Sequence, residues 1–198
     1  MTDLRVPGVL IGQRAIAAGD ERRLLPAELP MLARSVEKVR RASGAARALA
    51  RELLVPLGHE GWPILKAQAG APIWPPGIVG SLAHDDKIAM AALARRDDVA
   101  GLGIDVEPAE MLPADVLELV TTAQERRRIS DDPCGGRLIF VAKEAVYKAV
   151  YPLDRIFLEH HDVEVSLHDG KARVCNGRVV DLRLAVSTHL MALAWIGV

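Results

Sequence analysis

The sequence predicts an α+β fold, because one long helical pattern and two groups of strand-like runs alternate along its 198 residues. Apolar residues recur at helical spacing between residues 30 and 54. Three short apolar runs follow at 78–83, 87–94 and 99–106, and their charged boundaries are typical of strands in a buried sheet. We expect the last two runs to pair antiparallel. Further short apolar runs between 163 and 196 predict a second group of strands.

The remaining segments supply a first strand, a loop and two more helices. We expect a short strand at 8–12, an ordered loop rich in glycine and proline at 57–80, and helices at 113–129 and 137–150. Pro152 should end the last helix, because proline has no backbone N–H to donate and its ring clashes with the preceding turn.

A faint internal echo indicates two related halves. A serine, a nearby histidine and a strand of small apolar residues occur at 80–93 and again at 186–193. If this likeness reflects a duplication, two α+β halves pack against each other. The break would fall near Pro108, which gives an N-terminal half at 1–108 and a C-terminal half at 109–198.

The composition excludes several classes of function. The chain carries 25 basic and 26 acidic side chains, a net charge of -1 that is unlike a strongly basic nucleic-acid binder. Only 4% of the residues are aromatic, too few for a base-stacking platform. No secretory signal is visible, and no run approaches the roughly 20 apolar residues of a membrane span. With two distant cysteines, we expect a cytoplasmic protein with reduced thiols and no nucleic-acid or membrane partner.

The sharpest local signal is an acidic pair at the end of the third apolar run. Asp105 and Glu107 alternate with apolar residues, so in a strand both carboxylates share one face. Neighbouring carboxylates repel each other unless a cation or hydrogen bonds compensate them. Their oxygens suit a hard cation such as Mg²⁺, although two solvated acids at a sheet edge are the plainer alternative. The glycines of 101–103 lack the third glycine and the following helix of a dinucleotide-binding loop.

A second signal lies in the expected helix 137–150. Glu144 and Lys148 are one helical turn apart and face the same way. An exposed ion pair at this spacing is common and contributes only about 0.3–0.5 kcal/mol. Small alanines at 142, 145 and 149 favour a closely packed inner position for the pair instead.

Basic and histidine side chains give weaker signals. Arg40, Arg47 and Arg51 lie on one expected helix, where they form either a binding surface or an ordinary solvated face. His84 follows a strand end, and a lone histidine there is more often a structural hydrogen-bonding group than a ligand.

Taken together, these segments resemble the surfactin/enterobactin type of 4′-phosphopantetheinyl transferases, within the holo-carrier-protein synthase superfamily. The likeness covers roughly residues 40–167 in the order of the family. Its motifs are the arginine helix at 40–51, the stretch at 70–84, GIDVE at 103–107 and FVAKEAVYK at 140–148.

The resemblance implies a pseudo-two-fold monomer of two similar α+β halves, with coenzyme A in the cleft between them. Such an enzyme moves the 4′-phosphopantetheine group of coenzyme A onto a serine of an apo acyl or peptidyl carrier protein. It releases adenosine 3′,5′-bisphosphate. The alternative is a coenzyme A-binding regulatory module that performs no transfer.

The matching positions also imply roles for individual residues. Mg²⁺, or Mn²⁺ in its place, would be held by Asp105, Glu107 and Glu144. Glu144 is the first candidate for the general base, with Glu107 and a metal-bound water as alternatives. Lys148, with Lys143 nearby, would stabilise charge on the phosphates of coenzyme A. The nucleotide end would be gripped by Arg40, Arg47, Ser81 and His84.

Two departures from the family pattern concern coenzyme A binding. Ala42 and Ser43 stand where the family often has an acidic–aromatic pair, and Ala69 replaces a lysine that often contacts the 3′-phosphate. Lys66 is a candidate substitute for that lysine. The carrier partner should be an acidic helical bundle. The expected helix 113–129 is a candidate docking surface for it, although most of its leucines suit a core position better.

Overall fold

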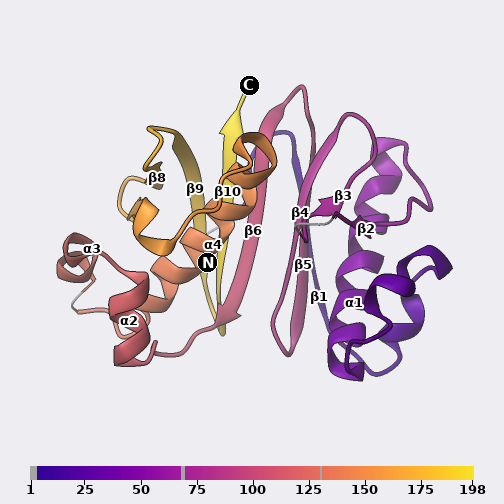
Figure 1. Ribbon diagram of the computed structural model, residues 1–198, viewed down its shortest axis with the longest axis horizontal. Helices are drawn as coiled ribbons and strands as arrows, with labels where there is room; N and C mark the ends of the chain where they lie inside the picture. The colour runs from indigo at the N-terminus through magenta and orange to yellow at the C-terminus, as the bar shows by residue number, and fades with distance from the viewer. Residues whose placement is uncertain (1–3, 68–69, 130) are drawn as a thin grey trace.

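The computed structural model describes residues 4–67, 70–129 and 131–198, which form two larger antiparallel sheets, each with a long helix against its outer face, and one two-stranded sheet (Figure 1). The N-terminal sheet has the strand order β1-β5-β4, and the C-terminal sheet has the order β6-β10-β9-β8-β7. The elements are β1 (Val9–Ala15), α1 (Glu37–Leu54), β2 (Leu65–Lys66), β3 (Pro72–Ile73), β4 (Ile78–His84), β5 (Ile88–Arg95), β6 (Val99–Pro108), α2 (Ala114–Val120), α3 (Ala123–Arg128), α4 (Gly135–Asp154), β7 (Val163–Ser166), β8 (Lys171–Val174), β9 (Val179–Val186) and β10 (His189–Gly197).

Both halves repeat one topology, which confirms the expected α+β fold of two similar halves. Each half runs from a first strand through a long helix into a hairpin, and the second hairpin strand pairs antiparallel with the first strand. The N-terminal unit is thus β1-α1-β4-β5, and the C-terminal unit is β6-α4-β9-β10. The similar stretches 80–93 and 186–193 lie in the hairpins β4-β5 and β9-β10.

Strand pairing changes two of the expectations. β6 pairs with β10 and not with β5, so the predicted antiparallel pairing of these two strands is wrong. β5 forms its hairpin with β4, where the Asp85 carboxylate accepts 2.7 Å hydrogen bonds from the backbone N–H groups of Lys87 and Ile88. Because β6 belongs to the C-terminal sheet, we propose that the boundary between the halves lies at residues 96–98, not at Pro108.

Two of the expected helices differ from the structure in their extent. Pro26 and Pro30 each begin a short 3-10 helix, and α1 begins only at Glu37. The expected helix 113–129 is broken into α2 and α3, because Thr122 caps a new helix. Its hydroxyl accepts a hydrogen bond from the Glu125 N–H, and the Glu125 carboxylate accepts one from the Thr122 N–H.

The helix α4 is longer than expected. Pro152 lies within its last turn and does not end it, since a proline there forfeits only one backbone hydrogen bond. Arg155 ends the helix in the left-handed conformation, with φ of 56°. No helix of the described residues is long and apolar enough to cross a membrane.

The two sheets lie in the middle of the molecule, between α1 on one side and α4 on the other (Figure 1). Leu102, Ile104 and Val106 of β6 pack into an apolar seam with side chains of the N-terminal sheet, including Val79 and Met90. Residues 101, 103 and 105 of the same strand therefore face α4. β4 and β6, the edge strands of their sheets, come together at this seam, and both line the site described next.

Candidate active site

A cleft of about 920 Å³ lies between the two halves. Its N-terminal wall is formed by α1, by β4 and by the loop that contains β3. Its C-terminal wall is formed by β6 and α4. Six of the predicted site residues line it: Arg47, Ser81, His84, Asp105, Glu144 and Lys148.

Two glycines of β6 let α4 approach close enough to build one side of this cleft. A Cβ added to Gly103 would lie 1.9 Å from the carbonyl oxygen of Ala145, and one added to Gly101 would lie 2.5 Å from that of Ala149. Any larger residue would force the helix away from the strand. Gly101 and Gly103, which do not fit the pattern of a dinucleotide-binding loop, thus allow the helix to pack closely on the strand.

The close approach brings Lys148 of α4 onto β6. Its ammonium donates to Oδ1 of Asp105 at 2.7 Å and to the carbonyl oxygen of Ile104 at 3.2 Å. A third contact of 3.4 Å reaches the carbonyl oxygen of Leu82 in β4. The lysine therefore touches both halves of the molecule and is fixed beside the acidic group.

The acidic side chains are close enough to influence one another. Burial raises the pKa of Glu144 above its usual range, and the negative charges of Asp105 and Glu107 raise it further, while Lys148 opposes the shift. Burial also raises the pKa of Glu107, with the Asp105 charge acting in the same direction. Each of these carboxyl groups therefore holds its proton more firmly than an isolated one, chiefly because burial disfavours the charged form and also because like charges lie nearby.

Glu107 is engaged by a cation that the sequence analysis did not single out. Nη1 of Arg137, in the first turn of α4, lies 2.9 Å from Oε2 of Glu107. Glu107 does not line the cleft. The structure thus brings Asp105, Glu144 and Lys148 together and holds the third carboxylate to one side.

The described residues contain no group of three or more His, Cys, Asp or Glu side chains placed to hold a metal ion. The donor chemistry nevertheless suits a hard divalent cation, since three carboxylates repel one another around one edge of β6. Two of them now meet protein cations instead, Asp105 through Lys148 and Glu107 through Arg137.

The opposite wall of the cleft carries a buried cation. Arg47 is only 6% exposed, and its guanidinium donates to the carbonyl oxygens of Ile64 at 3.0 Å and Ser43 at 3.4 Å. Burial lowers the pKa of Arg47, and among the described residues no carboxylate forms an ion pair with it. A desolvated guanidinium that lines a cleft without an ion-pair partner, and with only the nearby charge of Glu28 to offset its own, favours an anionic ligand.

His84 and Ser81 lie on β4, in the N-terminal wall. Desolvation by the surrounding protein lowers the pKa of His84, and the positive charges of Lys148 and Arg47 lower it further. The buried Ser81 lines the cleft nearby. The positive charges of both walls therefore act on His84, and an anion bound in the cleft would offset them.

Two predicted binding residues do not reach the cleft. Lys143 is 2% exposed and points to the far side of α4, where its ammonium donates to the Glu125 carboxylate and to the carbonyl oxygens of Val120 and His160, each at 2.8 Å. The expected contact of Lys143 with phosphate is thus wrong, because the side chain is used in a buried ion pair. Arg40 lies outside the cleft lining and donates to the backbone oxygen of Ser35.

One position that the sequence analysis connected with coenzyme A is outside the described residues. Ala69, the position where the family often has a lysine, lies outside them. Lys66 lines the cleft, as its expected role as a substitute requires. The cleft is also lined by Tyr147, Tyr151 and Arg155. The guanidinium of Arg155 lies 5.8 Å from the centre of the Tyr151 ring. The two tyrosines are four residues apart on α4 and share the helix face of Glu144 and Lys148, as the spacing in the sequence indicates.

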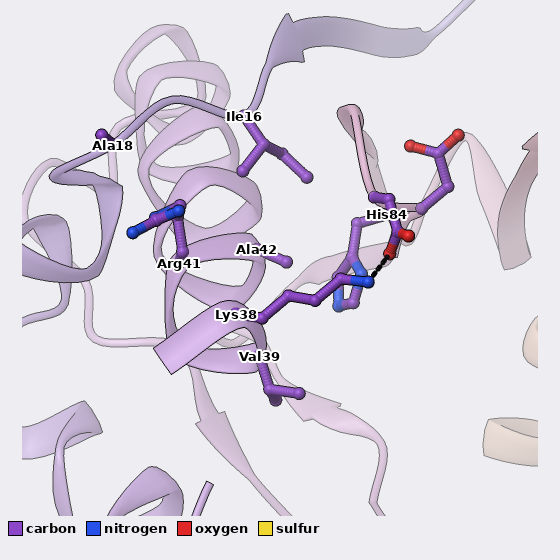
Figure 2. A pocket seen from close by; sticks show the side chains of 9 residues that line it. Ile16, Ala18, Lys38, Val39, Arg41, Ala42 and His84 are labelled. Carbon is purple, nitrogen blue, oxygen red and sulfur yellow. Dashed lines mark ion pairs between the residues drawn. The ribbon is translucent and has the colours of Figure 1, made fainter. Parts of the chain in front are cut away.

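A smaller hollow of about 360 Å³ lies next to the cleft, and His84 borders both (Figure 2). Lys38 of α1 reaches across its mouth to Asp86, 2.7 Å away (Figure 2). Arg41, on the same helix, pairs with Glu21 and Glu37. Both cations of this hollow are thus matched by carboxylates, in contrast to Arg47.

Comparison with known proteins identifies the class of enzyme. The profile of the 4′-phosphopantetheinyl transferase N-terminal domain matches residues 26–94, and that of the 4′-phosphopantetheinyl transferase superfamily matches residues 101–190. The chain belongs to the 4′-phosphopantetheinyl transferase superfamily and is thus a transferase. The two matches end and begin on either side of the connection between β5 and β6.

Individual relatives agree with this family. The chain is 41% identical over 157 residues to the 4′-phosphopantetheinyl transferase Npt of Nocardia iowensis, over 77% of this chain and 71% of that protein. It is 41% identical to PptT of Mycobacterium tuberculosis, over 72% of this chain and 64% of the relative. It is 39% identical to Svp of Streptomyces mobaraensis, over 73% and 61%.

Among solved structures, the holo-[acyl-carrier-protein] synthase of Thermotoga maritima is similar over 50% of the present chain and 64% of the synthase chain. Its TM-score is 0.40 and its sequence identity is 22%.

Proposed function

We propose that this enzyme transfers the 4′-phosphopantetheine group of coenzyme A to a serine of an apo acyl or peptidyl carrier protein, in a Mg²⁺-dependent reaction that releases adenosine 3′,5′-bisphosphate. One observation carries the proposal. A single cleft has an acid–lysine group on one wall and the unpaired, buried Arg47 on the other. Coenzyme A needs both, because it has a reactive pyrophosphate and a separate 3′-phosphate.

Arg47, Ser81 and His84 bind the nucleotide end of coenzyme A in this proposal. Arg47 lines the cleft with its guanidinium bound to backbone oxygens and not to a carboxylate, and a phosphate would provide the missing negative charge. The hydroxyl of Ser81 and the ring of His84 lie beside it on β4. Lys66 adds a further positive charge from the β2 side of the cleft.

Glu144 accepts the proton of the carrier serine. Its pKa is raised by burial and by neighbouring acids, which makes it a stronger base than an ordinary glutamate once it is deprotonated. The serine oxygen then forms a bond to the phosphorus that bears the pantetheine. The bond between this phosphorus and the oxygen that bridges it to the 5′-phosphate breaks, and the electron pair of that bond leaves with adenosine 3′,5′-bisphosphate. Glu107 is the alternative base.

Lys148 stabilises the negative charge that develops on the phosphates. Its ammonium is held beside the cleft by Asp105 and by two backbone oxygens, and it would exchange one of these contacts for a phosphate oxygen. Asp105, Glu107 and Glu144 would hold Mg²⁺, which when bound neutralises pyrophosphate charge and orients the phosphorus for in-line attack.

A single copy of the chain supplies both walls of the cleft, which supports a monomer as the working unit. Cys134 and Cys175 are both free, which suits a reducing compartment such as the cytoplasm.

The test incubates the protein with coenzyme A, Mg²⁺ and a panel of apo carrier proteins, followed by mass measurement of each carrier. We expect a gain of one phosphopantetheine group on at least one carrier. If coenzyme A binds but no carrier gains mass, the chain is a binding module and the proposed transfer is wrong.

Two variants separate the roles of the walls. Glu144→Gln should lower kcat about 10²–10⁴-fold, because it removes the proposed proton acceptor and a proposed cation ligand, and it should change the Kd of coenzyme A less than the substitution of Arg47 does. Arg47→Gln should weaken coenzyme A binding by roughly tenfold or more, because it removes a charge-assisted contact. Lys171→Met, an exposed change on β8, is the control and should alter neither.

A further inference from the structure

Arg137 occupies an unusual position beside the acidic group. It lies in the first turn of α4, and its guanidinium makes three contacts in three directions. Nε donates to the carbonyl oxygen of Glu110 at 2.9 Å, and Nη2 donates to that of Met111 at 3.2 Å. Nη1 donates to Oε2 of Glu107 at 2.9 Å. Two backbone contacts thus fix the guanidinium, and Glu107 is the one partner that can rotate away.

The three carboxylates differ in how they are held. Asp105 and Glu144 line the cleft, and Lys148 lies between the two elements that carry them. Glu107 points instead to Arg137, whose side chain is 16% exposed, while that of Glu107 is 30% exposed. Partial burial weakens screening by water, so this ion pair is stronger than one at an open surface.

We propose that Arg137 is a positioning residue that holds Glu107 away from Asp105 and Glu144, so that a divalent cation meets all three carboxylates only after the Arg137–Glu107 ion pair opens. This inference rests on the cation site of the proposed function. The inference predicts that loss of the ion pair raises the affinity for the cation, because the ion pair and the cation compete for the Glu107 carboxylate. Removal of the guanidinium frees Glu107 and also removes a positive charge that repels the cation.

The opposite role for Arg137 predicts the opposite result. If the guanidinium held Oε2 in order to aim the second oxygen of Glu107 at the cation, its loss would weaken cation binding. The direction of the change in affinity therefore decides between a competing role and an aligning role.

The experiment measures Mn²⁺ binding by electron paramagnetic resonance, in the absence of carrier protein and of turnover. It compares the wild-type chain with Arg137→Gln, Glu107→Gln and the double variant. We expect Arg137→Gln to bind Mn²⁺ about threefold to tenfold more tightly, the equivalent of losing one partly exposed ion pair. Glu107→Gln should bind it more weakly, and adding Arg137→Gln to that variant should give no further tightening.

Each other outcome has a defined meaning. Unchanged or weaker binding in Arg137→Gln, with wild-type binding intact, overturns the inference and leaves the proposed function standing. No Mn²⁺ binding by any of the proteins overturns the cation site and the inference together. Circular dichroism checks that each variant folds. If Arg137→Gln does not fold, Arg137→Lys replaces it, because it keeps the charge but loses the fork that reaches three acceptors, and it should tighten binding by a smaller factor.

Discussion

Each wall of the cleft carries one cation, of which Arg47 has no ion-pair partner among the described residues and Lys148 is paired with Asp105. Arg47 is buried with only backbone oxygens and a methionine sulfur as partners, and the Lys148 ammonium faces Asp105 at 2.7 Å. Both positive charges act on His84 and lower its pKa. A histidine in this position reports on the charge in the cleft, which makes it a useful probe.

The substitution Lys148→Met should raise the pKa of His84, because it removes a neighbouring positive charge that disfavours the protonated ring. Titration of the histidine resonances by NMR measures the change. Adenosine 3′,5′-bisphosphate added to the wild-type chain should also raise this pKa, since its phosphates bring negative charge. Lys171→Met, far from the cleft, should leave the pKa unchanged, and a lowered pKa in Lys148→Met would contradict the placement of these side chains.

Helix geometry explains which site residues the sequence could identify. Glu144 and Lys148 are four residues apart, so they share a face, and the structure has both at the cleft. Lys143 is five residues from Lys148, which turns it to a different face and into the buried pair with Glu125. Arg137 is more than a turn before Glu144, and its role depends on a loop that no local pattern predicts.

At the scale of elements, the spacing between β6 and α4 sets the site. Gly103 is a close contact of the helix backbone, because an added Cβ would lie 1.9 Å from the Ala145 carbonyl oxygen and 2.8 Å from the Ala149 nitrogen. Neither neighbour is a flexible side chain that could move aside. The packing of one helix on one strand therefore controls how near Glu144 and Lys148 come to Asp105.

The substitution Gly103→Ala should destabilise the protein by about 1–3 kcal/mol or more, because it overpacks this contact. It should also lower the rate of transfer, since a displaced α4 separates Lys148 from Asp105. Chemical denaturation measures the first effect and the carrier-mass assay the second. The matched control is Gly197→Ala, where an added Cβ meets nothing within 4 Å and both quantities should stay near their wild-type values.

The sequence was sufficient to predict elements but not their partners. Apolar runs identified β4, β5 and β6, because buried strands need continuous apolar side chains. Periodicity does not specify which edge each strand meets. The sequence therefore predicts a pair of β5 and β6, whereas the partner of β6 is β10, some 90 residues later. Helix ends were likewise set by caps, as at Thr122, which a single long apolar pattern obscures.

At the scale of the whole molecule, the two halves depend on one another. Leu102, Ile104 and Val106 of the C-terminal sheet fill the same apolar cluster as Val79 and Met90 of the N-terminal sheet. Polar contacts cross the seam as well. Lys148 reaches the Leu82 carbonyl oxygen, and Nε2 of His189 lies 2.9 Å from Oδ2 of Asp85, within ion-pair distance although not aligned as a hydrogen bond.

These shared contacts predict that the halves unfold together, although they repeat one topology. Differential scanning calorimetry should show a single transition whose calorimetric and van't Hoff enthalpies agree. Ile104→Ala, at a fully buried seam position, should lower stability by about 2–5 kcal/mol and move that single transition downward without splitting it. Coenzyme A, bound to both walls of the cleft, should move it upward. Two separate transitions, with only one shifted by Ile104→Ala, would mean that each half is stable alone and that the cleft is a flexible joint.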